Sequence, residues 1–143
     1  MTDAPAADLA PAEPTADAVL PILDPSAIDE FVEEVGNDAA ARTLATYLSE
    51  AERRLASLRA LAADQREAIH VEAHTLKGSS GLFGLLRLST AACRLERAAA
   101  TMTADAYRSM RNDLEAIHLE SRSALLTYLK QMRGVVALEG ANG

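Results

Sequence analysis

Residues 64–83 read DQREAIHVEAHTLKGSSGLF, and this stretch decides the fold. On a helical wheel of roughly 100° per residue, one set of small and apolar side chains clusters within about 40° of a single direction. The set is Ile69, Ala73, Leu76, Ser80 and Phe83. Such a stripe is typical of an amphipathic helix packed against other helices. The pattern predicts a helix that begins at Asp64, with Glu67 three positions later in a capping-box pattern, and ends near Phe83.

Further helices are predicted on both sides of this one, at residues 25–35, 37–61, 85–100 and 103–133. The first has Asp24 as N-cap and Pro25 at its first helical position, and Gly36 ends it. The longer helices carry apolar or small side chains at spacings of three and four. These are Leu44, Leu48, Ala51, Leu55, Leu58 and Ala62; Leu88, Ala92, Leu95 and Ala99; and Tyr107, Met110, Leu114, Ile117, Ser121, Ala124 and Tyr128. Because the loops are short, neighbouring helices should be antiparallel. The predicted fold class is all-α, an up-down antiparallel four-helix bundle with a short N-terminal capping helix.

Proline placement divides the chain into a domain and its tails. All five prolines lie at or before residue 25, and residues 1–21 consist mostly of Ala, Pro and Asp. This composition predicts a flexible Ala/Pro-rich tail over residues 1–21. The bundle domain is predicted over residues 22–134, and a short C-terminal tail over residues 135–143.

Composition limits the function classes. A chain of 143 residues with 49% hydrophobic and 24% charged residues suits one packed domain. Its formal net charge of −7 argues against a nucleic-acid partner, which would require clustered Lys and Arg. No stretch approaches the roughly 18 apolar residues of a membrane span, and no targeting signal is visible. Cys93 is the only cysteine, so no internal disulfide can form. We therefore expect a cytoplasmic protein with neither nucleic acid nor membrane as a partner.

The polar face of the helix over residues 64–83 carries the candidate chemistry. His74 lies roughly 140° from the centre of the apolar stripe, and His70 roughly 100°. Lys77, Gly78 and Gly81 lie on the same face. Each glycine costs about 1 kcal/mol relative to alanine inside a helix, so both need a reason. At Gly78, one turn beyond His74, the missing side chain leaves the imidazole open to a large partner.

These residue types suit phosphoryl chemistry on His74. A neutral imidazole has a nitrogen lone pair available near neutral pH, and Lys77 at i+3 can reach a charged group on that ring. Catalysis of phosphoryl transfer consists mainly of positioning and charge stabilisation. A carboxylate that accepts from Nδ1–H would leave Nε2 as the outward nucleophile, and Glu96 is a candidate for this role.

Several alternatives stay open at this stage. His70 and His74 have a spacing that could bind a metal, but two ligands are too few, so no metal site is predicted. His70 is instead expected beside the active ring or at the surface. Gly81 provides either access or close helix packing. Val71 and Leu82 either form the apolar part of a docking patch or pack against a neighbouring helix. Lys77 is either a phosphate contact or an ordinary solvated lysine.

Residues 73–80, AHTLKGSS, followed by Gly84, Leu88 and Leu95–Glu96, resemble the histidine phosphotransfer (HPt) domain of bacterial phosphorelays. The resemblance implies a four-helix bundle with His74 phosphorylated at Nε2, Lys77 as the cation and Gly78 as the residue that gives access. Glu96 matches a polar position near the ring. The run LFGLL at residues 82–86 is unusually apolar for this point of the family.

The resemblance implies a phosphocarrier rather than a kinase. His74 is expected to accept a phosphoryl group from a receiver-domain aspartate and to relay it to another receiver domain. The partners are receiver domains of response regulators or hybrid histidine kinases, and the chain is expected to be monomeric. No cofactor is expected on this chain, since Mg²⁺ belongs to the receiver. The rival hypothesis is a non-phosphorylated helical adaptor that merely resembles the family.

Overall fold

The computed structural model describes the backbone of residues 20–142 and the side chains of residues 20–132. The predicted tail over residues 1–21 therefore lies outside the described residues, apart from Leu20 and Pro21. Within the described range the regular structure is helical, and the helices are α2 (Pro25–Val35), α3 (Asn37–Ala60), α4 (Arg66–Leu82), α5 (Leu86–Ala98) and α6 (Ala104–Asn142). The all-α prediction is confirmed. None of the described helices combines the length and the apolar character needed to cross a membrane.

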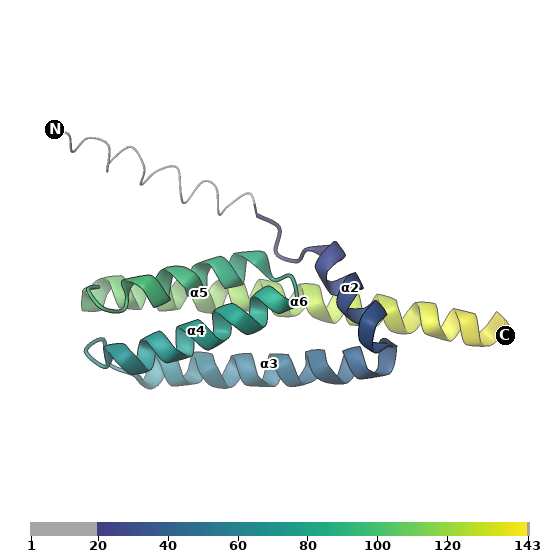
Figure 1. Ribbon diagram of the computed structural model, residues 1–143, viewed down its shortest axis with the longest axis horizontal. Helices are drawn as coiled ribbons and strands as arrows, with labels where there is room; N and C mark the ends of the chain where they lie inside the picture. The colour runs from purple at the N-terminus through teal and green to yellow at the C-terminus, as the bar shows by residue number, and fades with distance from the viewer. Residues whose placement is uncertain (1–19, 143) are drawn as a thin grey trace.

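The helices α3, α4, α5 and α6 lie side by side, and α2 lies at the end where α3 begins (Figure 1). Each of the four contacts the next along the chain, and α6 also contacts α3, so that they surround a shared core. The largest fully buried apolar side chains are Ile28, Leu44, Leu58, Ile69, Leu76, Leu85, Leu88, Leu95, Leu114 and Leu125. Burial of each such side chain stabilises the fold by about 1.5–3 kcal/mol relative to exposure.

The predicted apolar stripes are correct for three helices. Every predicted stripe residue of α4 and α5 is buried. In α3 the stripe is buried from Leu44 to Leu58, but Ala62 is exposed because the helix has already ended at Ala60. The apolar run at the end of α4 is only partly buried. Phe83, Gly84 and Leu85 are buried, while Leu82, the last residue of α4, is exposed.

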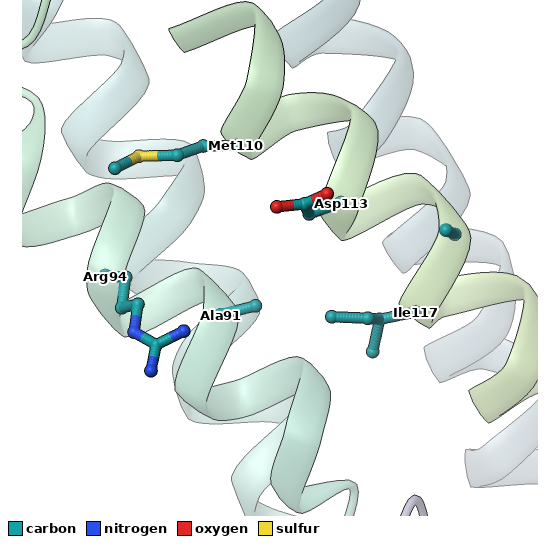
Figure 2. Close-up of a pocket in the computed structure, with 6 residues that line it drawn as sticks. Ala91, Arg94, Met110, Asp113 and Ile117 are labelled. Carbon is teal, nitrogen blue, oxygen red and sulfur yellow. The ribbon is translucent and has the colours of Figure 1, made fainter. Parts of the chain in front are cut away.

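The predicted stripe of α6 is only partly correct, because three of its seven residues, Tyr107, Leu114 and Ser121, are buried. The buried residues are Tyr107, Leu114, His118, Ser121, Leu125 and Leu129. Met110, Ile117, Ala124 and Tyr128, which the sequence placed in the core, are only partly buried. Met110 and Ile117 instead line a groove of about 190 Å³ between α5 and α6 (Figure 2). The sequence prediction chose Ile117 instead of His118 for the core, because hydrophobic spacing alone favours the apolar residue of this neighbouring pair.

Helix ends differ from the sequence prediction at two places. Asp24 caps α2 as expected, accepting from the backbone N–H of Ser26 at 3.0 Å. The predicted start of α4 at Asp64 is wrong, because residues 62–65 form a turn in which the Gln65 side chain accepts from the Ala62 N–H at 2.8 Å. At the other end of the chain, α6 continues to Asn142, beyond the predicted end near Arg133.

A turn between α4 and α5 joins this helix pair to the N-terminal part of the domain. Gly84 has a φ of 78°, and its carbonyl accepts from the Asp24 N–H at 2.8 Å. Arg87, at the start of α5, donates to the carbonyl of Leu20 at 2.6 Å. These contacts anchor the segment before α2 next to the end of α4.

Candidate functional site

The candidate site lies along the line where α4 packs against α5. The buried stripe of α4 faces the core, which turns His70, His74 and Lys77 toward the edge shared with α5. The start of α4 is fixed by Arg66, which donates to the carbonyls of Ala99 and Met102 at 2.9 Å and 3.0 Å. These carbonyls follow the end of α5, so that one guanidinium sets the relative position of the two helices.

Glu96 of α5 contacts both predicted functional side chains of α4. Its Oε2 lies 2.7 Å from Nδ1 of His74, and its Oε1 lies 2.7 Å from Nζ of Lys77. An ionised carboxylate only accepts hydrogen bonds. Nδ1 of His74 therefore carries a proton and donates a hydrogen bond to Glu96. Nε2, on the other edge of the ring, then holds the lone pair, and the His74 side chain is 62% exposed.

The two contacts keep the carboxylate ionised. The hydrogen bond from Lys77, followed by that from His74, lowers the pKa of Glu96 to about 2. Its Oε1 is buried from solvent and faces the ammonium. Lys77 is therefore paired with Glu96 in this structure and is not a freely solvated lysine.

His70 lies beside the His74 ring, on the preceding turn of α4. The rings of His70 and His74 stack with centroids 6.2 Å apart and an interplanar angle of 10°. Nδ1 of His70 lies 3.3 Å from the backbone carbonyl of Glu96, and its Nε2 lies 3.7 Å from Glu96 Oε2. His70 thus faces α5 and Glu96, which is the expected position beside the ring.

The two glycines of α4 have different surroundings. A Cβ at Gly78 would meet nothing within 4 Å, so the space beside His74 is open. A Cβ at Gly81 would lie 3.1 Å from Oγ of Ser89 on α5, so Gly81 allows close helix packing. The sequence interpretation had left these two roles of Gly81 open.

Ser89 is a site neighbour that the sequence analysis missed. Its hydroxyl donates a hydrogen bond to the backbone carbonyl of Lys77 at 3.0 Å, on the side of α4 that faces α5. Ser89 precedes Glu96 by seven residues, which places both on one face of α5. This spacing of seven residues was the sequence signal from which Ser89 could have been identified.

The outer face of α4 carries two exposed apolar side chains. Val71 is 52% exposed and Leu82 is 63% exposed. Each of the two side chains therefore presents more than half of its surface to solvent. With Gly78 between them, they follow one line along the outside of α4 at spacings of seven and four residues.

Other features of the described part of the chain do not join this site. Across those residues, no group of three or more His, Cys, Asp or Glu side chains is arranged to hold a metal ion. The groove between α5 and α6 is lined by Ala91, Arg94, Met110, Asp113, Ala116 and Ile117 (Figure 2). Glu96 and His70, which contact His74, do not line this groove.

Comparisons with known proteins agree with this geometry. The model of the Hpt domain family matches residues 42–134. The comparison with curated proteins gave no match. Among solved structures, the crystal structure of histidine-containing phosphotransfer protein B (HptB) from Pseudomonas aeruginosa PAO1 is similar, with a TM-score of 0.70 and 24% identity. The match covers 78% of this chain and 96% of that one, and it shows a shared fold.

Because the family model covers more than half of its length, the chain belongs to the Hpt domain family. It is a histidine phosphotransfer protein of phosphorelays, and this function takes the place of the rival adaptor hypothesis. Members of the family are phosphocarriers rather than kinases, and they interact with receiver domains of two-component phosphorelays.

Proposed function

We propose that His74 is the phosphoacceptor, and that it takes a phosphoryl group from a receiver-domain aspartate and relays it to a second receiver domain. The observation that carries the proposal is the 2.7 Å contact between Nδ1 of His74 and Glu96 Oε2 on an otherwise exposed ring. This contact selects the tautomer with the lone pair on Nε2 and orients that nitrogen away from α5.

In the proposed step, the Nε2 lone pair attacks the phosphorus of the receiver's aspartyl phosphate. The bond between phosphorus and the aspartate oxygen breaks, and its electron pair leaves with the carboxylate. The reverse attack, by a carboxylate of the second receiver, completes the relay. We expect this chain to need no cofactor, with Mg²⁺ bound by the receiver domain.

Lys77 is the proposed phosphate-stabilising cation. It is 33% exposed and three residues from His74, so its ammonium can turn from Glu96 to a phosphoryl group on Nε2. Positioned charge of this kind is the main contribution that a protein makes to phosphoryl transfer. Lys77→Ala should therefore slow transfer while the fold is retained.

The proposed docking surface for the receiver is the outer face of α4, with Val71 and Leu82 on either side of Gly78. Gly81 lies next to it, although its contact with Ser89 favours a packing role. The expected partners are response regulators or hybrid histidine kinases, with no nucleic-acid or membrane partner. We also propose that the protein is a cytoplasmic monomer and that its bundle has an up-down antiparallel topology.

The deciding experiment uses a phosphorylated receiver domain carrying a radioactive phosphoryl group. The wild-type chain should acquire acid-labile, base-stable label, and His74→Gln should acquire none. His70→Gln, on the same helix and also exposed, is the matched control and should still be labelled. Label on His74→Gln, or on neither protein, would rule out the assignment of His74.

A further inference from the structure

The groove between α5 and α6 lies apart from the residues that contact His74. It has a volume of about 190 Å³, and alanine, methionine and isoleucine side chains line it together with one arginine and one aspartate (Figure 2). A hollow of this size accommodates a few side chains of one peptide segment. A stable complex of two folded proteins needs more, roughly 800 Å² of buried surface on each partner.

The N-terminal end of the described chain lies at the head of this groove. Arg87, at the start of α5, donates from Nε to the backbone carbonyl of Leu20 at 2.6 Å. Arg87, Ala91 and Arg94 follow one another at spacings of four and three residues, so they form one line along α5. Ala91 and Arg94 are the α5 wall of the groove. Leu20 is therefore held at the end of the line that continues into the groove.

We propose that residues 14–19, PTADAV, bind in the groove between α5 and α6 of their own chain, with Asp17 paired to Arg94 and Val19 on the apolar wall beside Ala91. These six residues precede the described range, to which they are joined at Leu20. This docking is independent of the proposed role of His74.

The length of the segment matches the length of the groove. An extended chain advances about 3.3 Å per residue, so Asp17 lies about 10 Å from Leu20 when the segment is extended. Arg94 follows Arg87 by seven helical residues, which corresponds to about 10.5 Å along α5. Side chains alternate along an extended segment, so Asp17 and Val19 lie on the same side. Asp17 therefore reaches Arg94 while Val19 faces the apolar part of the groove.

The charges of the two surfaces are complementary. Residues 1–19 contain four carboxylates and no lysine or arginine. Helix α5 contains three arginines and one carboxylate, Glu96, which faces α4. The guanidinium of Arg94 has five donors and can bind a carboxylate alongside another acceptor, whereas Asp113 is a like charge on the α6 wall. Because the segment is tethered, its effective concentration at the groove is roughly millimolar, so modest contacts suffice.

A segment bound in this groove leaves the candidate site accessible. Glu96 follows Arg87 by nine residues, a rotation of roughly 900°, which places Glu96 on the opposite side of α5. His74 and the rest of α4 lie on that opposite side, in contact with Glu96. Phosphoryl transfer to His74 should therefore proceed equally well whether the segment is bound or free.

The test uses nuclear magnetic resonance of the full chain with ¹³C-labelled methyl groups. Wild type should show nuclear Overhauser contacts from the Val19 methyl groups to those of Ala91 and Ile117, and Val19→Ser identifies the Val19 signals by their loss. A sample mixed from labelled and unlabelled chains separates contacts within one chain from contacts between two copies.

Charge reversal tests the ion pair. Asp17→Lys and Arg94→Glu should each lower the ratio of bound to free segment about three- to fivefold, and the double variant should restore most of the contact intensity. Asp17→Lys precedes the bundle in sequence, so its effect does not depend on how α5 tolerates Arg94→Glu. Arg97→Glu is the matched control, because Arg97 is an exposed arginine of α5 that does not line the groove.

Three results would overturn the proposal: absence of the Val19 contacts, contacts found only between labelled and unlabelled chains, or a double variant no better than the single variants. Slower transfer from a phosphorylated receiver to His74 in Asp17→Lys would also contradict it. Failure of the relay is a separate result, since a chain that shows the Val19 contacts but accepts no phosphoryl group retains the docking and loses only the proposed function.

Discussion

Glu96 contacts two different side chains of α4, His74 through Oε2 and Lys77 through Oε1. The contact with His74 could be anticipated, because a carboxylate on the next helix is the natural acceptor for Nδ1–H. The pairing of Lys77 with the same carboxylate could not. A lysine has a long side chain with several rotamers, and its choice between solvent, phosphate and carboxylate depends on distances across two helices.

Gly78 offers a residue-scale prediction about access to His74. Gly78→Gln should fold normally, because a Cβ there meets no atom within 4 Å and glutamine is a better helix former by up to about 1 kcal/mol. Transfer from a phosphorylated receiver should fall at least about tenfold, since the new side chain occupies the space beside the imidazole. The measurements are far-ultraviolet circular dichroism and receiver-to-protein transfer rates.

Phosphoramidate provides the internal control for this variant. A small donor does not need the docking space, so labelling of His74 by phosphoramidate should stay near the wild-type rate. Transfer from the receiver at an unchanged rate would show that the missing side chain at Gly78 has no part in access.

At the element scale, the pairing of α4 with α5 explains why two glycines of one helix have different roles. Gly78 and Gly81 look alike in the sequence, since both interrupt the polar face of α4. Only the register of α5 shows that Ser89 lies opposite Gly81. The start of α4 was also not fixed by local sequence. Asp64 fits a capping-box pattern, but the side chain of Gln65 accepts a hydrogen bond from the Ala62 N–H and closes the turn before α4.

The turn between α4 and α5 gives an element-scale prediction. Gly84→Ala should lower the free energy of unfolding by about 1–3 kcal/mol, because the residue has a φ of 78° and its Cβ would lie 2.9 Å from the carbonyl oxygen of Asp24. Urea unfolding measures the loss. Gly36→Ala is the matched control, since Gly36 also has a positive φ but no atom within 4 Å of the added Cβ. The loss at Gly84 should exceed that at Gly36, and an equal loss would mean that the contact with Asp24 is unimportant.

For the whole molecule, helix identity and the stripes of α3, α4 and α5 followed from hydrophobic spacing. The full buried line of α6 did not, because it includes the polar residue His118, which the predicted stripe left out. Spacing rules assign polar residues to the surface, so a core histidine displaces the prediction toward the nearest apolar neighbour. The proximity of His70, His74 and Lys77 on α4 was predictable, because the three residues share one short helical stretch.

We expect His118 to make the free energy of unfolding depend on pH. It is buried, and neither ring nitrogen has a hydrogen-bond partner within the described structure. Burial lowers the pKa of His118 below its ordinary value of 6.5, which Glu52 at 3.6 Å only partly opposes and Arg122 reinforces. The unfolded chain therefore binds this proton more readily than the folded one, so the free energy of unfolding should fall as pH drops through about 6.5.

His118→Leu should remove this dependence and raise the free energy of unfolding by about 1–3 kcal/mol, since it replaces a buried polar ring that lacks partners. Urea unfolding of both proteins between about pH 8 and about pH 5 tests this. His70→Gln, which replaces an exposed imidazole instead of the buried one, is the matched control. A wild-type profile that is flat across this interval would show that protonation of His118 carries no cost.

Within the described part of the chain, the hydrogen-bond and ring partners of His74 are His70 and Glu96, which lie on the consecutive helices α4 and α5, joined by a short turn. Contacts between segments so near in sequence close small loops and form early when a chain collapses. The candidate site around His74 can therefore assemble before α3 and α6 complete the bundle. Since these partners lie on α4 and α5, substitutions on the outer surfaces of α3 and α6 should leave the contacts of His74 unchanged.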